Sequence, residues 1–105
     1  MRIVFLQQDP LLAETYRTKL ELDGYQVTMA NASDHALQDL RAQPPDIIFL
    51  DASSGVAADR AVLHGLRDDP TMGRIPVVIL SSRSAGQLAS DGLDLGPLDY
   101  LVHCV

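Results

Sequence analysis

The chain has 105 residues, a net charge of -6 and an apolar content of 47%, which together suit a single domain with a buried core. An acidic surface repels phosphate backbones and anionic lipids, so we expect this domain to bind neither nucleic acid nor membrane directly. The one cysteine, Cys104, excludes an internal disulfide and fits a reducing, cytoplasmic location, and no apolar run approaches membrane-spanning length.

Five short apolar runs alternate with amphipathic stretches along the chain. The runs cover residues 3–6, 25–29, 47–50, 77–80 and 100–102. Three of them are continuously apolar, which is typical of central strands that helices bury on both faces. The second run alternates between apolar and polar residues and therefore predicts an edge strand.

Helical patterns fill the stretches between the runs. Asp9 suits the N-cap of a first helix and Pro10 its first position, and Gly24 is the expected stop. Further helices are expected over residues 33–42 and 58–67. The stretch 84–95 contains Gly86 and Gly92, each of which costs about 1 kcal/mol relative to alanine, so a short, irregular or mobile helix is expected there.

This alternation predicts an α/β fold with a parallel sheet and right-handed crossovers. Such sheets place their functional site beyond the carboxyl ends of the strands. The residues at those ends are Gln7-Gln8-Asp9, Asp51 to Gly55 (with Ser53), Ser81-Ser82 and His103-Cys104. We therefore expect polar side chains to gather along one edge of the sheet.

Four motifs occur in order along the chain: Asp9-Pro10-Leu11-Leu12, the run from Pro44 to Asp51, the run from Ile75 to Ser81, and Asp99-Tyr100-Leu101. Their residues and their spacing together resemble one known family. From Ile3 to Val105 the chain resembles the receiver domain of two-component response regulators. The resemblance implies a flavodoxin-like, doubly wound sheet of five parallel strands in the order 2-1-3-4-5.

The fifth helix that normally follows the last strand of such a domain is absent, because the sequence stops at Val105. We expect residues 1–105 to form one receiver-like domain that was either cut short or is the N-terminal part of a longer protein. One face of the sheet should then be only partly covered. An exposed apolar face of this kind favours a homodimer.

Asp51 matches the aspartate that accepts the phosphoryl group in the family. From the residue alone, a carboxylate at a strand end could attack phosphorus, or it could cap the following loop through the amides near Ser53 and Ser54.

Gln7 and Gln8 stand where the family has the acidic pair that holds magnesium. Carboxamide oxygens are neutral and are much weaker ligands for a hard cation than carboxylates. Asp9 lies one position too late and fits a helix N-cap better, although a one-residue slip would turn it inward. We expect no cofactor; any metal ion would be held by Asp51, Asp9 and the backbone of Ser53.

Three further positions follow from the resemblance. His103 replaces the lysine that contacts the phosphoryl group, and an unperturbed histidine is mostly neutral at cytoplasmic pH. Ser81 matches the hydroxyl position that reports phosphorylation, and Tyr100 matches the aromatic switch. The structural alternatives are a polar strand end for His103, a satisfied hydroxyl for Ser81, and a partly buried ring for Tyr100.

Our leading hypothesis is a degenerate receiver (a pseudo-receiver): a signal-transduction domain, not an enzyme, that contacts an effector domain or a sensor kinase without magnesium-dependent phosphorylation. The alternative is a working phosphoacceptor of a two-component phosphorelay, phosphorylated on Asp51 with magnesium. A flavin or nucleotide site is disfavoured, because the turn from Gln7 to Pro10 lacks the glycines and amide donors that cradle phosphate.

Overall fold

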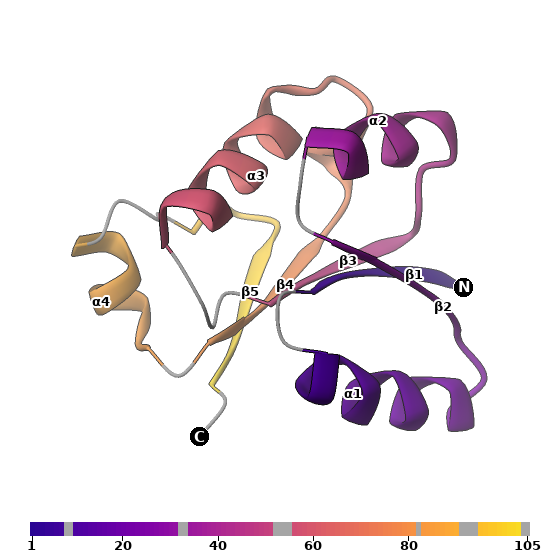
Figure 1. Cartoon of the computed structure of the whole chain (residues 1–105). Coiled ribbons are helices and arrows are strands. Elements are labelled where there is room, and N and C mark those ends of the chain that lie inside the picture. Colours follow the sequence, from indigo (N-terminus) through magenta and orange to yellow (C-terminus); the bar gives the residue numbers. More distant parts are fainter. Residues whose placement is uncertain (8–9, 32–33, 52–55, 82, 91–94, 104–105) are drawn as a thin grey trace.

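The computed structural model describes residues 1–7, 10–31, 34–51, 56–81, 83–90 and 95–103 (Figure 1). Strands and helices alternate along it, as the sequence predicts. The strands are β1 (Arg2–Gln7), β2 (Gln26–Asn31), β3 (Ile47–Asp51), β4 (Val77–Ser81) and β5 (Asp99–His103). The helices are α1 (Pro10–Leu22), α2 (Asp34–Ala42), α3 (Val56–Asp68) and α4 (Ala85–Ser90), with a 3-10 turn η1 at Met72–Arg74.

The five strands form one parallel sheet in the order β2-β1-β3-β4-β5, which confirms the predicted topology. β2 is an edge strand, as its alternating pattern indicates. It begins one residue later than predicted, because Tyr25 instead closes the turn after α1. The central strands β1, β3 and β4 are buried or partly buried on both faces, which explains why their sequences are continuously apolar.

Helices cover the sheet on two sides (Figure 1), with α1 on one face and α2 and α3 on the other. The larger core cluster lies on the α2 and α3 side and includes Leu40 from α2, Leu66 from α3 and Leu88 from α4. The smaller cluster lies under α1 and centres on Phe5, Ala13 and Leu80. No helix in the described ranges is long and apolar enough to cross a membrane.

Gly24 ends α1 with a backbone conformation that favours glycine. Its φ angle is 95°. The Gly24 N–H donates to the carbonyl of Glu21, and the Tyr25 N–H donates to the carbonyl of Leu20, the hydrogen-bond pattern of a Schellman motif. These bonds satisfy carbonyls that would otherwise lack partners at the helix end, and they confirm Gly24 as the predicted stop.

The fourth helix is short, as the glycines in its sequence predict. α4 has six residues, and its first turn is closed by two reciprocal bonds: the Ser84 N–H donates to Gln87 Oε1, and the Gln87 N–H donates to Ser84 Oγ. This is a capping box. Among the side chains of α4 that the structure describes, Leu88 is fully buried in the core and anchors the helix to the rest of the domain.

Part of the sheet face on the α1 side is open. α1 packs on β1 and β2, whereas Phe49 and Val78 on the same face are only partly buried, and Tyr100 and Val102 of β5 are 56% and 39% exposed. β5 is the last element that the structure describes. The described elements therefore cover the face over β4 and β5 only in part.

Asp69 organises the connection between α3 and β4. Its carboxylate accepts hydrogen bonds from the N–H groups of Thr71 and Met72 and from Arg41 Nε, the last at 2.6 Å. The Met72 N–H, and after it the Arg41 guanidinium, lower the pKa of Asp69 below its ordinary value of 3.8. This one side chain therefore joins the end of α2 to η1.

We expect replacement of Gly24 by alanine to destabilise the fold by about 1–2 kcal/mol, because a Cβ at positive φ is strained. No atom lies within 4 Å of the new Cβ, so the cost would be conformational and not a clash. Gly86→Ala is the matched control. Its Cβ has ordinary space in α4, and it should leave stability unchanged or raise it by up to about 1 kcal/mol. Urea unfolding measures the change in the free energy of unfolding for both variants. Equal changes would contradict the conclusion that the positive φ of Gly24 requires glycine.

Asp69 should make stability depend on pH in the acid range. Because its folded pKa lies below the unfolded value, its contribution is complete above the ordinary pKa and is lost as pH falls through the folded pKa. Asp69→Asn should lower the urea midpoint near neutral pH, and its difference from wild type should shrink on acidification. The neighbouring exposed Asp68→Asn is the control and should show no such convergence.

Candidate functional site

The ends of four strands meet along one edge of the sheet and carry the predicted polar positions. Asp51, Ser81 and His103 are the final residues of β3, β4 and β5, and Gln7 is the final residue of β1. Gln7 and Asp51 directly follow Leu6 and Leu50, which are paired across β1 and β3. Ser81 is paired with His103. The expected gathering at the carboxyl edge is therefore present in the backbone.

Asp51 is a buried acidic residue at the centre of this edge, with no exposed surface. β3 pairs with β1 on one side and with β4 on the other. Asp51 at its end therefore lies between Gln7 of β1 and Leu80 of β4. A buried carboxylate is stable only where polar groups or cations compensate its lost hydration. The loop amides at Ser53 and Ser54, proposed as one such source, lie outside the described residues.

Ser81 is also buried, and its hydroxyl has an identified contact. Its Oγ accepts a hydrogen bond from the Arg83 N–H at 3.0 Å. A hydroxyl can accept and donate at the same time, so this bond leaves the Ser81 proton available for an acceptor such as a phosphoryl oxygen. The satisfied-hydroxyl interpretation and the reporting role are thus compatible in this geometry. Arg83 was not among the positions that the sequence singled out.

The structure describes some of the remaining predicted positions in full, some only in their backbone, and some not at all. Tyr100 is 56% exposed, which is compatible both with the partly buried ring of the structural alternative and with the switch position. The backbones of Gln7 and His103 are described in their strands, but their side chains are not. Gln8, Asp9, Ser53 and Cys104 lie outside the described residues. Within the part of the chain that is described, no three His, Cys, Asp or Glu side chains form a group that could hold a metal ion.

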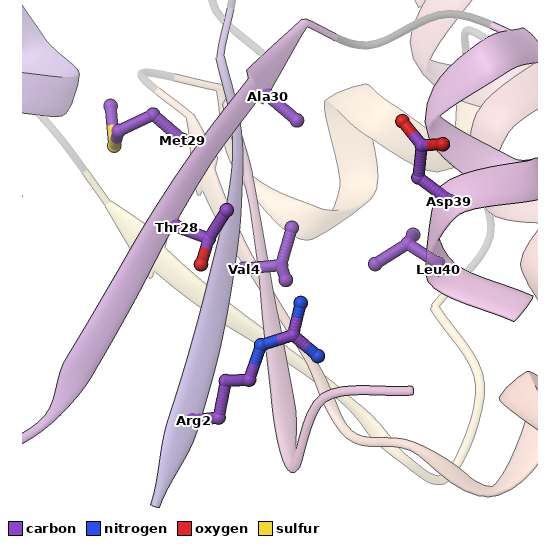
Figure 2. Close-up of a pocket in the computed structure, with 7 residues that line it drawn as sticks. All are labelled: Arg2, Val4, Thr28, Met29, Ala30, Asp39 and Leu40. Carbon is purple, nitrogen blue, oxygen red and sulfur yellow. The ribbon is translucent and has the colours of Figure 1, made fainter. Parts of the chain in front are cut away.

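A small cavity lies away from this edge, between β2 and α2 (Figure 2). Its volume is about 120 Å³, which is room for roughly four water molecules. Figure 2 shows the guanidinium of Arg2 and the carboxylate of Asp39 reaching it from opposite sides, with Val4 and Leu40 between them. None of the residues at the carboxyl edge lines it, so the cavity is not part of the candidate site.

The sequence did not reveal an ion pair between Arg67 of α3 and Asp99 of β5. The two residues are far apart along the chain. Asp99 entered the sequence analysis only as part of a family motif, and Arg67 only as the predicted end of a helix. The available signal was a charged residue at the start of an otherwise apolar strand, where burial would demand a partner.

The chain is similar to known proteins over almost its whole length. Residues 3–105 match the family of the response regulator receiver domain. The chain is 35% identical over 101 residues to the alginate biosynthesis transcriptional regulatory protein AlgB of Pseudomonas putida, covering 96% of this chain and 22% of that protein. It is 32% identical over 101 residues to the response regulator MprA of Mycobacterium leprae, covering 96% and 43% respectively.

Among solved structures, the chain superimposes on the chemotaxis protein CheY4 of Vibrio cholerae with a TM-score of 0.78, covering 96% of this chain and 84% of that one. The sequence identity of 18% makes this a likeness of fold alone. The chain spans less than half the length of the curated relatives that it matches.

Proposed function

This chain belongs to the response regulator receiver family, and we propose that within it the chain is a pseudo-receiver, which signals by contacting other proteins without magnesium-dependent phosphorylation of Asp51. The observation that supports this most is the identity of the residues at the carboxyl edge. Asp51 is the only acidic residue at the described ends of β1, β3, β4 and β5, beside Gln7, Ser81 and His103.

The family chemistry depends on charge that this edge lacks. Magnesium binds through one or two carboxylates and keeps the rest of its shell as water, and phosphoryl transfer relies on metal and lysine charge to neutralise the developing negative charge. With amides at Gln7 and Gln8, the donor set fits magnesium poorly. With a ring at His103, the permanent cation is replaced by a group that is mostly neutral near pH 7.

The alternative function is a working phosphoacceptor, supported by the retained Asp51 and by the Ser81 hydroxyl, whose proton is left available by its bond from Arg83. In that case Asp51 Oδ would attack the phosphorus of a donor such as acetyl phosphate, forming an acyl phosphate while the bond to the departing acetate breaks. Ser81 would donate a hydrogen bond to a phosphoryl oxygen. Asp9 would have to supply the second carboxylate for the metal. The two functions differ in a directly measurable property, namely whether Asp51 accepts a phosphoryl group.

The partners that we propose are proteins. Relatives are named as transcriptional regulatory proteins or response regulators, and each is more than twice as long as this chain. We infer that the domain acts beside an effector domain, in the same polypeptide or a separate one, or beside a sensor kinase. The net charge of -6 favours a protein partner over direct contact with nucleic acid.

We expect calorimetry to detect no magnesium binding by the wild-type domain at millimolar concentrations, and acetyl phosphate with magnesium to leave its intact mass unchanged. The variant with Gln7→Asp, Gln8→Asp and His103→Lys restores the missing charges and should gain one phosphoryl group under the same conditions. Adding Asp51→Asn to that variant is the control and should abolish the gain. Stoichiometric modification of the wild-type domain would establish the phosphoacceptor alternative instead.

We also propose that the open sheet face supports a homodimer, because Tyr100 and Val102 expose apolar surface on β5. Val102→Glu should shift sedimentation equilibrium toward monomer, since it places a charge in that face. Leu22→Glu is the control: Leu22 is 82% exposed but lies at the end of α1, so its replacement should leave association unchanged. A monomeric wild-type domain at high micromolar concentration would exclude the dimer.

A further inference from the structure

A buried ion pair joins α3 to the start of β5. Arg67 Nη2 contacts Asp99 Oδ1, and the two side chains are 23% and 1% exposed. Arg67 lies in the last turn of α3, and Asp99 is the first residue of β5. The pair therefore connects a helix on one face of the sheet to the point where the final strand begins.

The second oxygen of Asp99 holds the turn that precedes the strand. Oδ2 accepts a hydrogen bond from the Gly96 N–H at 2.6 Å, while the Asp99 N–H donates to the Gly96 carbonyl at 3.1 Å. A Cβ at Gly96 would approach Asp99 Oδ2 to 3.3 Å and Arg67 Nε to 3.8 Å. The carboxylate, the guanidinium and the turn therefore fit together with little room to spare.

The energetics of this pair point to positioning more than to net stability. Burial lowers the pKa of Arg67, which shows that the guanidinium loses hydration. All three guanidinium nitrogens of Arg67, and Oδ1 of Asp99, are buried without a hydrogen-bond partner among the described residues. Buried ion pairs with incomplete hydrogen bonding contribute little net stability, yet removal of one partner leaves the other charge buried and uncompensated.

We propose that the Arg67–Asp99 pair fixes the position of β5 and thereby keeps Tyr100 in its exposed orientation. Asp99 and Tyr100 are adjacent on a strand, so their side chains point to opposite faces of the sheet. Asp99 contacts Arg67 on the α3 side of the sheet, and Tyr100 is 56% exposed on the opposite face. This inference rests on the proposed function as a pseudo-receiver, and it takes from the family resemblance that Tyr100 stands at the position of the aromatic switch.

Fluorine NMR of the full chain with fluorotyrosine incorporated tests the proposal, because the chain has three tyrosines and Tyr100→Phe identifies the relevant signal. Asp99→Asn and Arg67→Met should each displace or broaden the Tyr100 signal. Amide exchange of residues 99–103 should accelerate by about a hundredfold or more, because each variant leaves one buried charge unpaired. Asp69→Asn removes the acidic partner of Arg41, an ion pair elsewhere, and should leave the Tyr100 signal in place.

Gly96→Ala keeps the experiment decisive if the charge variants do not fold. It changes no charge but crowds the Asp99 carboxylate, and it should move the Tyr100 signal in the same direction by a smaller amount. An unchanged Tyr100 signal in every folded variant of this set would overturn the proposal. Because no magnesium or phosphoryl donor is present, that result would not bear on whether Asp51 is phosphorylated, which the mass measurement decides separately.

Discussion

The parallel pairing of β1 with β3, and of β3 with β4, is the constraint on which the rest of this domain depends. It buries Leu6, Leu50 and Ile79 side by side, and the register of these three residues decides which side chains come next to one another at the carboxyl edge. A slip of one residue would exchange the faces of every side chain in a strand. The apolar packing of the core therefore brings Gln7, Asp51 and Ser81 to one place.

The chemistry open to this edge depends on charge more than on shape. The fold supplies a buried carboxylate at Asp51 and a buried hydroxyl at Ser81, both at strand ends. The neighbouring positions in the sequence are the amides Gln7 and Gln8 and the ring of His103, and on the proposed function this residue set makes magnesium-dependent phosphorylation unfavourable. A fold of this kind can keep its surface for partners after its chemistry weakens, because the core and the edge use different residues.

The sequence predicted the elements well where local patterns dominate. The alternation of strands and helices, the stop at Gly24 and the short α4 follow from apolar periodicity and from the conformational preferences of glycine and proline. The strand order, in contrast, was implied by the family resemblance. The gathering of Asp51, Ser81 and His103 followed from the general geometry of parallel sheets. The Arg67–Asp99 pair could not be predicted, because it depends on how closely α3 approaches the turn before β5. That distance is set by tertiary packing and not by any local pattern.

The two sides of the sheet are held with unequal strength. The core between the sheet and α3 is large and includes Leu63, Leu66 and Met72, whereas the layer under α1 rests mainly on Phe5, Ala13 and the ring contact between Phe5 and Tyr16. Partial unfolding should therefore begin with detachment of α1, leaving the sheet and α3 as a residual cooperative unit. Such an intermediate would bare Phe5 and Leu80, which makes the α1 layer the point at which mechanical or chemical stress most readily leads to aggregation.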